Sequence, residues 1–114
     1  MATVVSQQSA EHYIWGEKCD GWHLVKSKNL SVIQERVPAG CYESRHFHQQ
    51  AEQFFFILSG IATIELEEQV FTLTPNQGLH IPAGAKHQVS NQHQGDLVFI
   101  VTSTPPSHGD RFET

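Results

Sequence analysis

The sequence has little positive charge. It contains seven Lys and Arg residues against twelve Asp and Glu among 114 residues, and the basic residues form no run. Binding to a phosphate backbone depends on clustered Lys and Arg, so we expect no nucleic-acid partner. The length is enough for one domain with one core and too short for two.

Long apolar segments are also missing. The longest runs, such as FFFIL at residues 54–58, are about a quarter of the ~20 residues that cross a bilayer, and residues 1–12 lack a charged-then-apolar signal pattern. These absences predict a cytoplasmic protein without a membrane partner. Cysteine is scarce as well. Cys19 and Cys41 are expected to be free thiols, with a disulfide as the less favoured alternative.

Helical periodicity is weak throughout and has its best case at residues 6–15. Short segments rich in Val, Ile, Phe, Leu and Thr fill the rest, separated by Asn, Gly, Pro and Ser at roughly eight to twelve residues. They span residues 22–27, 30–37, 53–60, 61–68, 69–74, 78–82, 87–91 and 96–103. This spacing predicts an all-β fold, an antiparallel sandwich or barrel. We expect a single domain with its core at about residues 22–104 and loosely held ends at about residues 1–12 and 105–114.

Histidine is abundant, with eight in the chain. It is the commonest metal ligand and the usual proton carrier near neutral pH. On a strand, residues two apart share a face, which places His46 and His48 on the same side, roughly 6.5 to 7 Å apart. Both imidazoles could then converge on one ion. Tyr42 and Ser44 are expected to share this face.

Two spaced motifs carry a family resemblance. The first contains Gly40, His46, His48, Gln53 and Gly60. The second contains Pro82, Gly84, His87 and Asn91, with Asn76 where the motif begins with Gly. Asn also tolerates the left-handed conformation that a tight turn needs, so this departure is mild. Together the motifs resemble the two signatures of the cupin superfamily, over about residues 30–104.

The resemblance implies a cupin-type jelly roll, a double-stranded β-barrel of two antiparallel sheets. It implies one divalent metal held by His46, His48, Gln53 and His87. Glu52 is the alternative to Gln53, because strand alternation does not choose between them, but the spacing to the closing Gly of the motif favours Gln53. Three neutral imidazoles and an amide would leave the site at +2. Zn, Ni, Mn, Fe and Cu all suit such ligands.

Candidate catalytic residues are few: Tyr42, Ser44 and His80. The remaining histidines are interpreted as surface or hydrogen-bonded residues; these are His12, His23, His93 and His108. The ligand set is also similar to that of pectin-degradation cupins, which place an acid on the last strand. Here that strand offers Thr102 and Thr104 instead, so their activity is not expected.

The functional hypothesis is a metal-dependent enzyme that isomerises, cyclises or oxygenates a small sugar-like, keto-acid-like or phenol-like molecule. The alternatives are a metal-bound binding or sensor module without turnover and a purely structural dimeric barrel. Residues 53–59 are apolar on both faces, which predicts a homodimer. The tail at residues 105–114 is interpreted as solvated or subunit-bridging, with a lid over the barrel mouth as the alternative.

Overall fold

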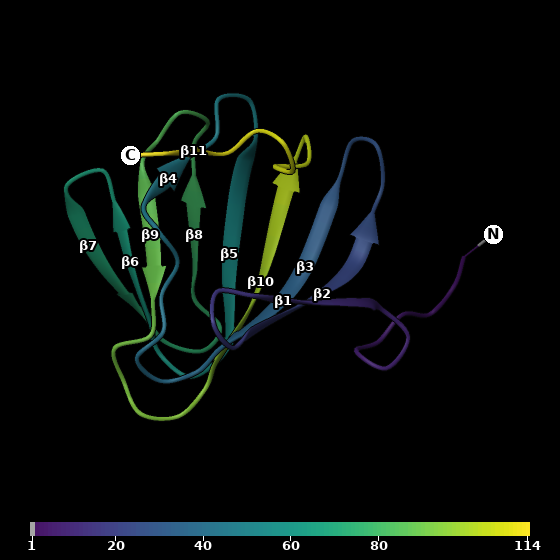
Figure 1. The fold of residues 1–114 in the computed structure, drawn as a ribbon, viewed down its shortest axis with the longest axis horizontal. Coiled ribbons are helices and arrows are strands. Elements are labelled where there is room, and N and C mark those ends of the chain that lie inside the picture. Colours follow the sequence, from purple (N-terminus) through teal and green to yellow (C-terminus); the bar gives the residue numbers. More distant parts are fainter. Residues whose placement is uncertain (1) are drawn as a thin grey trace.

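The structure is a computed structural model that describes residues 2–114, and it confirms the all-β prediction (Figure 1). The described chain forms strands and no helix. The strands are β1 (Glu11–Trp15), β2 (Cys19–Lys26), β3 (Ser31–Val37), β4 (His46–Phe47), β5 (Glu52–Ser59), β6 (Ala62–Leu66), β7 (Gln69–Leu73), β8 (Gly78–Ile81), β9 (His87–Ser90), β10 (Leu97–Thr104) and β11 (Phe112–Glu113).

The strands form two antiparallel sheets. One has the order β1-β2-β3-β10-β5-β8 and the other has the order β11-β4-β9-β6-β7. Their strands converge at the lower end of Figure 1 and separate toward the upper end. Within residues 2–114 no strand pairs with a strand of the other sheet, so the two sheets form a sandwich rather than a closed barrel. We refer to the end where the two sheets separate as the wide end.

Strand alternation produces the core. Along β10 and β5, inward-facing Phe55, Ile57, Leu97 and Phe99 are buried while the residues between them are more exposed. Burial of each such side chain stabilises the fold by about 1.5–3 kcal/mol. The same alternation continues toward the wide end, where the inward positions become polar and include Gln53.

Both chain ends differ from their sequence predictions. The weak helical pattern at residues 6–15 is wrong as an indication of helix, because residues 11–15 form β1, with Tyr13 and Trp15 on the inner face at the two-residue period of a strand. The folded core therefore begins before residue 22. At the other end, residues 112–113 form β11 and pair with β4, so this end is held by backbone hydrogen bonds.

The turn expectation at Asn76 is confirmed. Its φ is 69°, in the left-handed region where Asn is one of the few tolerated residues. The Gly that closes the first motif, Gly60, also has a steric reason, because a Cβ atom there would lie 2.9 Å from the Cα of Leu97 and closer still to the carbonyl oxygen of Asp96. A side chain at Gly60 would therefore push β5 away from the start of β10.

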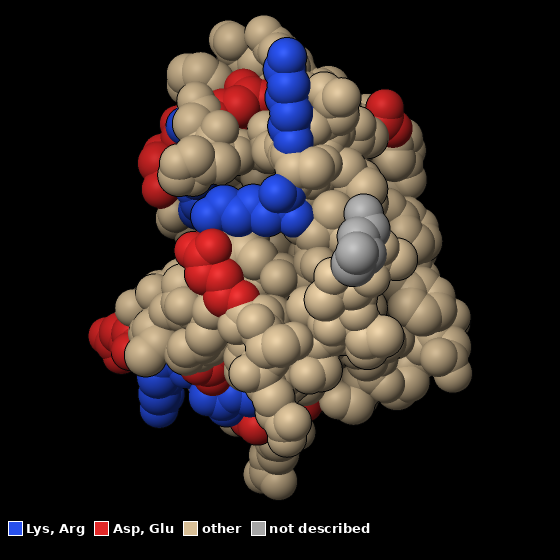
Figure 2. Space-filling model, turned by 90° about the vertical axis from the view of Figure 1, so that its right-hand side faces the viewer, with Lys and Arg blue, Asp and Glu red and all other residues tan. Residues whose placement is uncertain are grey.

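Cys19 and Cys41 are free thiols, as expected. No helix long and apolar enough to cross a membrane occurs within residues 2–114. On the face drawn in Figure 2, the described Lys and Arg side chains are interspersed with Asp and Glu and form no continuous basic surface.

Candidate metal centre

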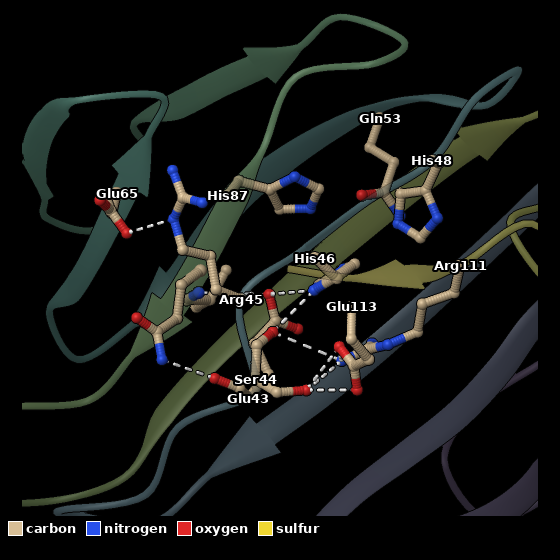
Figure 3. Close-up of polar contacts among 12 residues, drawn as sticks. Glu43, Ser44, Arg45, His46, His48, Gln53, Glu65, His87, Arg111 and Glu113 are labelled. Carbon is tan, nitrogen blue, oxygen red and sulfur yellow. Dashed lines mark hydrogen bonds and ion pairs between the residues drawn. The ribbon is translucent and has the colours of Figure 1, made fainter.

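Three buried histidines meet between the sheets. His46 on β4 and His87 on β9 are direct register partners, and His48 follows β4 by one residue. One ligand atom from each of the three lies within 4.8 Å of the others. The ring centroids of His46 and His48 are 4.8 Å apart, and those of His46 and His87 are 4.4 Å apart. These three residues are therefore placed to hold one metal ion (Figure 3).

Backbone carbonyls orient all three rings. The Nδ1 atom of His46 lies 2.8 Å from the carbonyl oxygen of Ser44, that of His87 lies 3.0 Å from the carbonyl oxygen of Ala85, and that of His48 lies 2.6 Å from the carbonyl oxygen of Asp110. A carbonyl only accepts, so each Nδ1 carries the hydrogen and each Nε2 keeps its lone pair. This is the tautomer that binds a metal through Nε2.

Gln53 completes the cluster from the facing sheet. Its Nε2 donates to the Oγ of Ser103, its register partner on β10, at 3.0 Å, which leaves the Oε1 atom toward the histidines. The Glu52 carboxylate instead lies on the outer face, is 56% exposed and sits 2.8 Å from His80 Nε2. The structure therefore brings Gln53, and not Glu52, to the histidines.

The donor set fits a metal because its lone pairs lack other partners. The Nε2 atoms of His48 and His87 and the Oε1 atom of Gln53 are buried and have no hydrogen-bond partner among the described residues. Each unsatisfied buried polar group costs roughly 1 to 3 kcal/mol. Packing alone does not explain why four residues converge when this leaves buried acceptors unpaired. One cation would satisfy all of the acceptors at once.

Burial also keeps the rings neutral. Desolvation lowers the pKa of His46 to about 3 and the pKa of His87 to about 4, and it lowers the pKa of His48 in the same direction. The carbonyl hydrogen bonds act against this shift but do not reverse it. Neutral imidazoles are the form that a metal requires, so the site is prepared for binding well below pH 7.

The proposed catalytic residues are not brought to the histidines. Tyr42 is 64% exposed, the Ser44 hydroxyl bonds to the Glu113 carboxylate at 2.8 Å, and His80 lies on the outer face of its sheet. The expectation that Tyr42 and Ser44 share the face of the ligands is wrong, because residues 43–45 leave the strand geometry and shift the alternation by one position. Glu43 takes the inner position instead.

The cluster opens into a cavity of about 760 Å³, which is within the usual size range of a small-molecule site. Its walls combine apolar rings with acids and hydroxyls. Trp15 and Phe55 form part of the apolar wall, while Tyr13, Glu35 and Glu43 supply polar groups. A ligand in this cavity would contact the metal ligands and these carboxyl groups together.

Two carboxyl groups of the cavity are strongly perturbed. Burial raises the pKa of Glu35 to about 7, although a hydrogen bond of 2.9 Å from the Tyr13 hydroxyl opposes the shift. Burial raises the pKa of Glu43 to about 8, and the charge of Glu35 adds to this effect. Perturbed carboxyls in a cleft are typical of acid–base sites. Sequence reasoning missed both, because single acidic residues on predicted strands carry no motif.

Two histidines interpreted as surface or hydrogen-bonded residues also line the cavity. His23 lies on β2 with its Nδ1 atom buried and without a hydrogen-bond partner, and His108 belongs to the C-terminal tail. Arg111 reaches the cavity from the same tail. Residues 105–114 therefore contribute part of the cavity wall.

The sequence comparison places the chain in a family. Residues 33–103 match the family model described as "Cupin domain", which is more than half of the chain. The protein is a member of the cupin family. The match spans the stretch from β3 to β10 and contains all four residues of the cluster, so the resemblance of the two motifs is confirmed.

Curated relatives share the same segment. An uncharacterized protein of Methanocaldococcus jannaschii is 27% identical over 89 residues, covering 77% of this chain and 71% of that protein. The alginate biosynthesis protein AlgA of Pseudomonas fluorescens is 35% identical over 88 residues, which cover 75% of this chain but only 17% of AlgA. The chain thus spans a small part of this second relative.

Solved structures share the fold at low identity. KdgF from Halomonas sp. superposes with a TM-score of 0.85 at 15% identity, covering 94% of this chain and 98% of that chain. The polyketide cyclase RemF from Streptomyces resistomycificus has a TM-score of 0.81 at 16% identity, covering 93% and 81%. At these identities the likeness establishes the cupin fold alone.

Proposed function

We propose that the protein is a metal-dependent cupin enzyme that moves a proton within a small polar molecule, by isomerisation or cyclisation. The observation that carries the metal centre is the convergence of unpaired acceptors: the Nε2 atoms of His48 and His87 and the Oε1 atom of Gln53. His46 provides the fourth donor. A bound divalent metal would supply Lewis-acid polarisation of a substrate oxygen.

The ligand set itself offers no base. The amide of Gln53 does not take a proton near pH 7, and the imidazole lone pairs are directed at the cluster. We assign this role to Glu35, because it lines the same cavity and has a pKa of about 7, which suits both removal and return of a proton. Its partner Tyr13 holds the carboxyl by the hydroxyl bond at 2.9 Å.

The reaction then follows from these groups. Glu35 would remove a proton from the carbon adjacent to a carbonyl group whose oxygen a bound metal would polarise, and would return it at another position of the same molecule. The electrons of the broken C–H bond shift within the substrate, so nothing is oxidised and no co-reactant is needed. This balance favours isomerisation or cyclisation over oxygenation. Structural neighbours include a polyketide cyclase and a sugar phosphate isomerase, so the fold accommodates both reactions.

The lining of the cavity favours a small polar substrate. The cavity has hydroxyl groups at Ser31 and Ser103, a guanidinium at Arg111 and the aromatic faces of Trp15 and Phe55. Sugar-like and keto-acid-like molecules match this mixture of polar and apolar surface. A panel of such molecules, incubated with metal-loaded protein in D₂O and followed by NMR, tests the proposal. Deuterium incorporation or conversion that disappears in Glu35→Gln supports the enzyme.

The alternative function is a binding module. Tight binding of a panel member by the metal-loaded protein, with neither deuterium incorporation nor conversion of any member, would favour this alternative. Absence of metal binding by wild-type protein would remove both functions. We also propose a homodimer, because Phe54 and Leu58 on the outer face of β5 are 44% and 39% exposed.

A further inference from the structure

One ligand of the cluster is oriented differently from the other two. The Nδ1 atoms of His46 and His87 each bond to a carbonyl two residues earlier in the chain, so their orientation is set locally. The Nδ1 atom of His48 bonds at 2.6 Å to the carbonyl oxygen of Asp110, which is 62 residues away in sequence. The third ring therefore takes its orientation from the end of the chain.

Asp110 also fixes the segment that carries His48. Its Oδ1 atom accepts the backbone N–H of Gln49 at 3.0 Å, and its Oδ2 atom accepts those of Gln50 and Ala51 at 2.9 and 3.0 Å. These residues connect β4 to β5 and lie between His48 and Gln53. Carboxylate bonds to N–H groups are roughly twice as strong as neutral ones. One side chain thus clamps the connection between two candidate ligands.

The rest of the tail is attached beside the cluster. We refer to residues 105–114 as the C-terminal strap. Phe112 pairs with Phe47 and stacks on its ring at a centroid distance of 5.3 Å, and the Glu113 carboxylate accepts from the Ser44 hydroxyl (Figure 3). Ser44 is also the residue whose carbonyl orients His46. The strap is therefore held on the chain segment that supplies two of the three histidines.

We propose that Asp110 is a positioning residue of the metal centre and that closure of the C-terminal strap and metal binding are coupled. This inference rests on the proposed metal site. When the strap is closed, the Asp110 carbonyl keeps the His48 ring in the tautomer and orientation that aim Nε2 at the cluster. When it opens, His48 loses this partner and Gln49, Gln50 and Ala51 lose theirs. Coupling of this kind is reciprocal, so a bound metal must hold the strap closed by the same factor.

The strap also links the metal to ligand access. His108 and Arg111 line the cavity, so an open strap removes part of the cavity wall. A protein with metal bound should therefore present a more complete cavity than the metal-free protein. Metal loading would in this way prepare the substrate site as well as the Lewis acid.

The decisive experiment measures Zn²⁺ affinity by competition with a chromophoric chelator in full-length Asp110→Asn. This variant keeps the backbone carbonyl but loses the carboxylate clamp. We expect Zn²⁺ binding about 10- to 100-fold weaker than in wild type, the range found for residues that orient metal ligands. The matched control is Asp96→Asn, whose carboxylate is exposed and pairs with Arg36, and which should bind Zn²⁺ as wild type does.

A second readout follows the strap directly. Amide hydrogen exchange at Gln49, Gln50 and Ala51 should slow when Zn²⁺ is added to wild type and should respond less in Asp110→Asn. If that variant does not fold, Phe112→Ala weakens the strap at a partly exposed position without touching Asp110 or His48, and a smaller loss of affinity in the same direction is expected. Unchanged Zn²⁺ affinity in Phe112→Ala would count against the coupling.

The outcomes separate this inference from the proposed function. If wild-type protein binds Zn²⁺ and the Zn²⁺ affinity of Asp110→Asn is within about twofold of the wild-type affinity, the proposed function stands and the inference is overturned. Exchange at the three amides that does not respond to Zn²⁺ overturns the coupling even if affinity falls. Wild-type protein that binds no metal overturns both.

Discussion

His46 and His87 face each other as direct register partners on β4 and β9, with ring centroids 4.4 Å apart. The Nε2 atom of His87 is buried without a hydrogen-bond partner among the described residues, and an unpaired acceptor of this kind is costly. This pair comes from one sheet, while Gln53 approaches from the other. The metal centre therefore depends on the packing of the two sheets against each other.

Replacing His87 should abolish stoichiometric metal. In His87→Ala we expect metal content to fall from near one ion per chain to near zero and Zn²⁺ affinity to fall about 100-fold or more, because a ligand is lost and not merely reoriented. Elemental analysis by plasma mass spectrometry measures this. His80→Ala is the matched control, since His80 is 56% exposed and pairs with Glu52. Equal metal content in both variants would contradict the site.

A carboxylate in place of Gln53 should strengthen metal binding. Gln53→Glu lowers the charge of the loaded site from +2 to +1 and adds Coulomb attraction, and we expect affinity for Zn²⁺ to rise about tenfold, or about 1.4 kcal/mol. Gln53→Leu should weaken binding instead. Chelator competition measures both. Glu52→Gln should have no effect, because Glu52 lies on the outer face; a loss of affinity in that variant would restore Glu52 as a ligand.

The buried histidines should make the metal-free protein less stable in acid. The pKa of His87 is about 4 when folded, below the value of about 6.5 for an unfolded histidine, so between these values the unfolded chain binds a proton that the folded chain does not. Stability relative to His87→Gln should therefore fall as the pH falls from 6.5 to 4. Urea unfolding at several pH values measures the difference, and a wild-type curve parallel to that of the variant would contradict it.

Glu35 should have the opposite effect. Its folded pKa of about 7 lies above the unfolded value of about 4.3, so the folded chain binds the extra proton between these values. Wild type should lose stability relative to Glu35→Gln as the pH rises from 4.5 through 7. The same urea measurements test this difference. Glu11→Gln, at an exposed carboxyl that pairs with Lys26, is the control variant.

Gly21 should be required for the position of Tyr13. The two are register partners on β2 and β1, and a Cβ atom at Gly21 would collide with the Tyr13 ring. Gly21→Ala should destabilise the fold by about 1–3 kcal/mol, the usual cost of overpacking, and should displace the hydroxyl that bonds to Glu35. In a Tyr13→Ala background the same substitution should cost much less. A double-mutant cycle from thermal or urea unfolding checks this, and additive effects would contradict it.

Much of the fold could be predicted from local pattern. Short segments rich in Val, Ile, Phe, Leu and Thr, separated by turn residues, indicate the antiparallel all-β fold, but the apolar runs of β5 and β10 do not indicate which side chains face the core. The segments around Gly60 and Asn76 carry turn residues whose backbone requirements are local. The prediction failed at β1, where residues 6–15 show a weak helical pattern, and at β11, which has only two residues. Both strands are held by pairing with a neighbouring strand.

The candidate site divides in the same way. His46, His48, Gln53 and His87 occupy spaced motifs, so the sequence by itself determined the cupin family and the side chains that meet in the cluster. Only the tertiary structure decided which other groups surround them. Glu35 and Glu43 become acid–base candidates through burial, and Asp110 reaches His48 across 62 residues. The physical reason is that motifs record local spacing, whereas burial and long-range contacts exist only after the two sheets have packed.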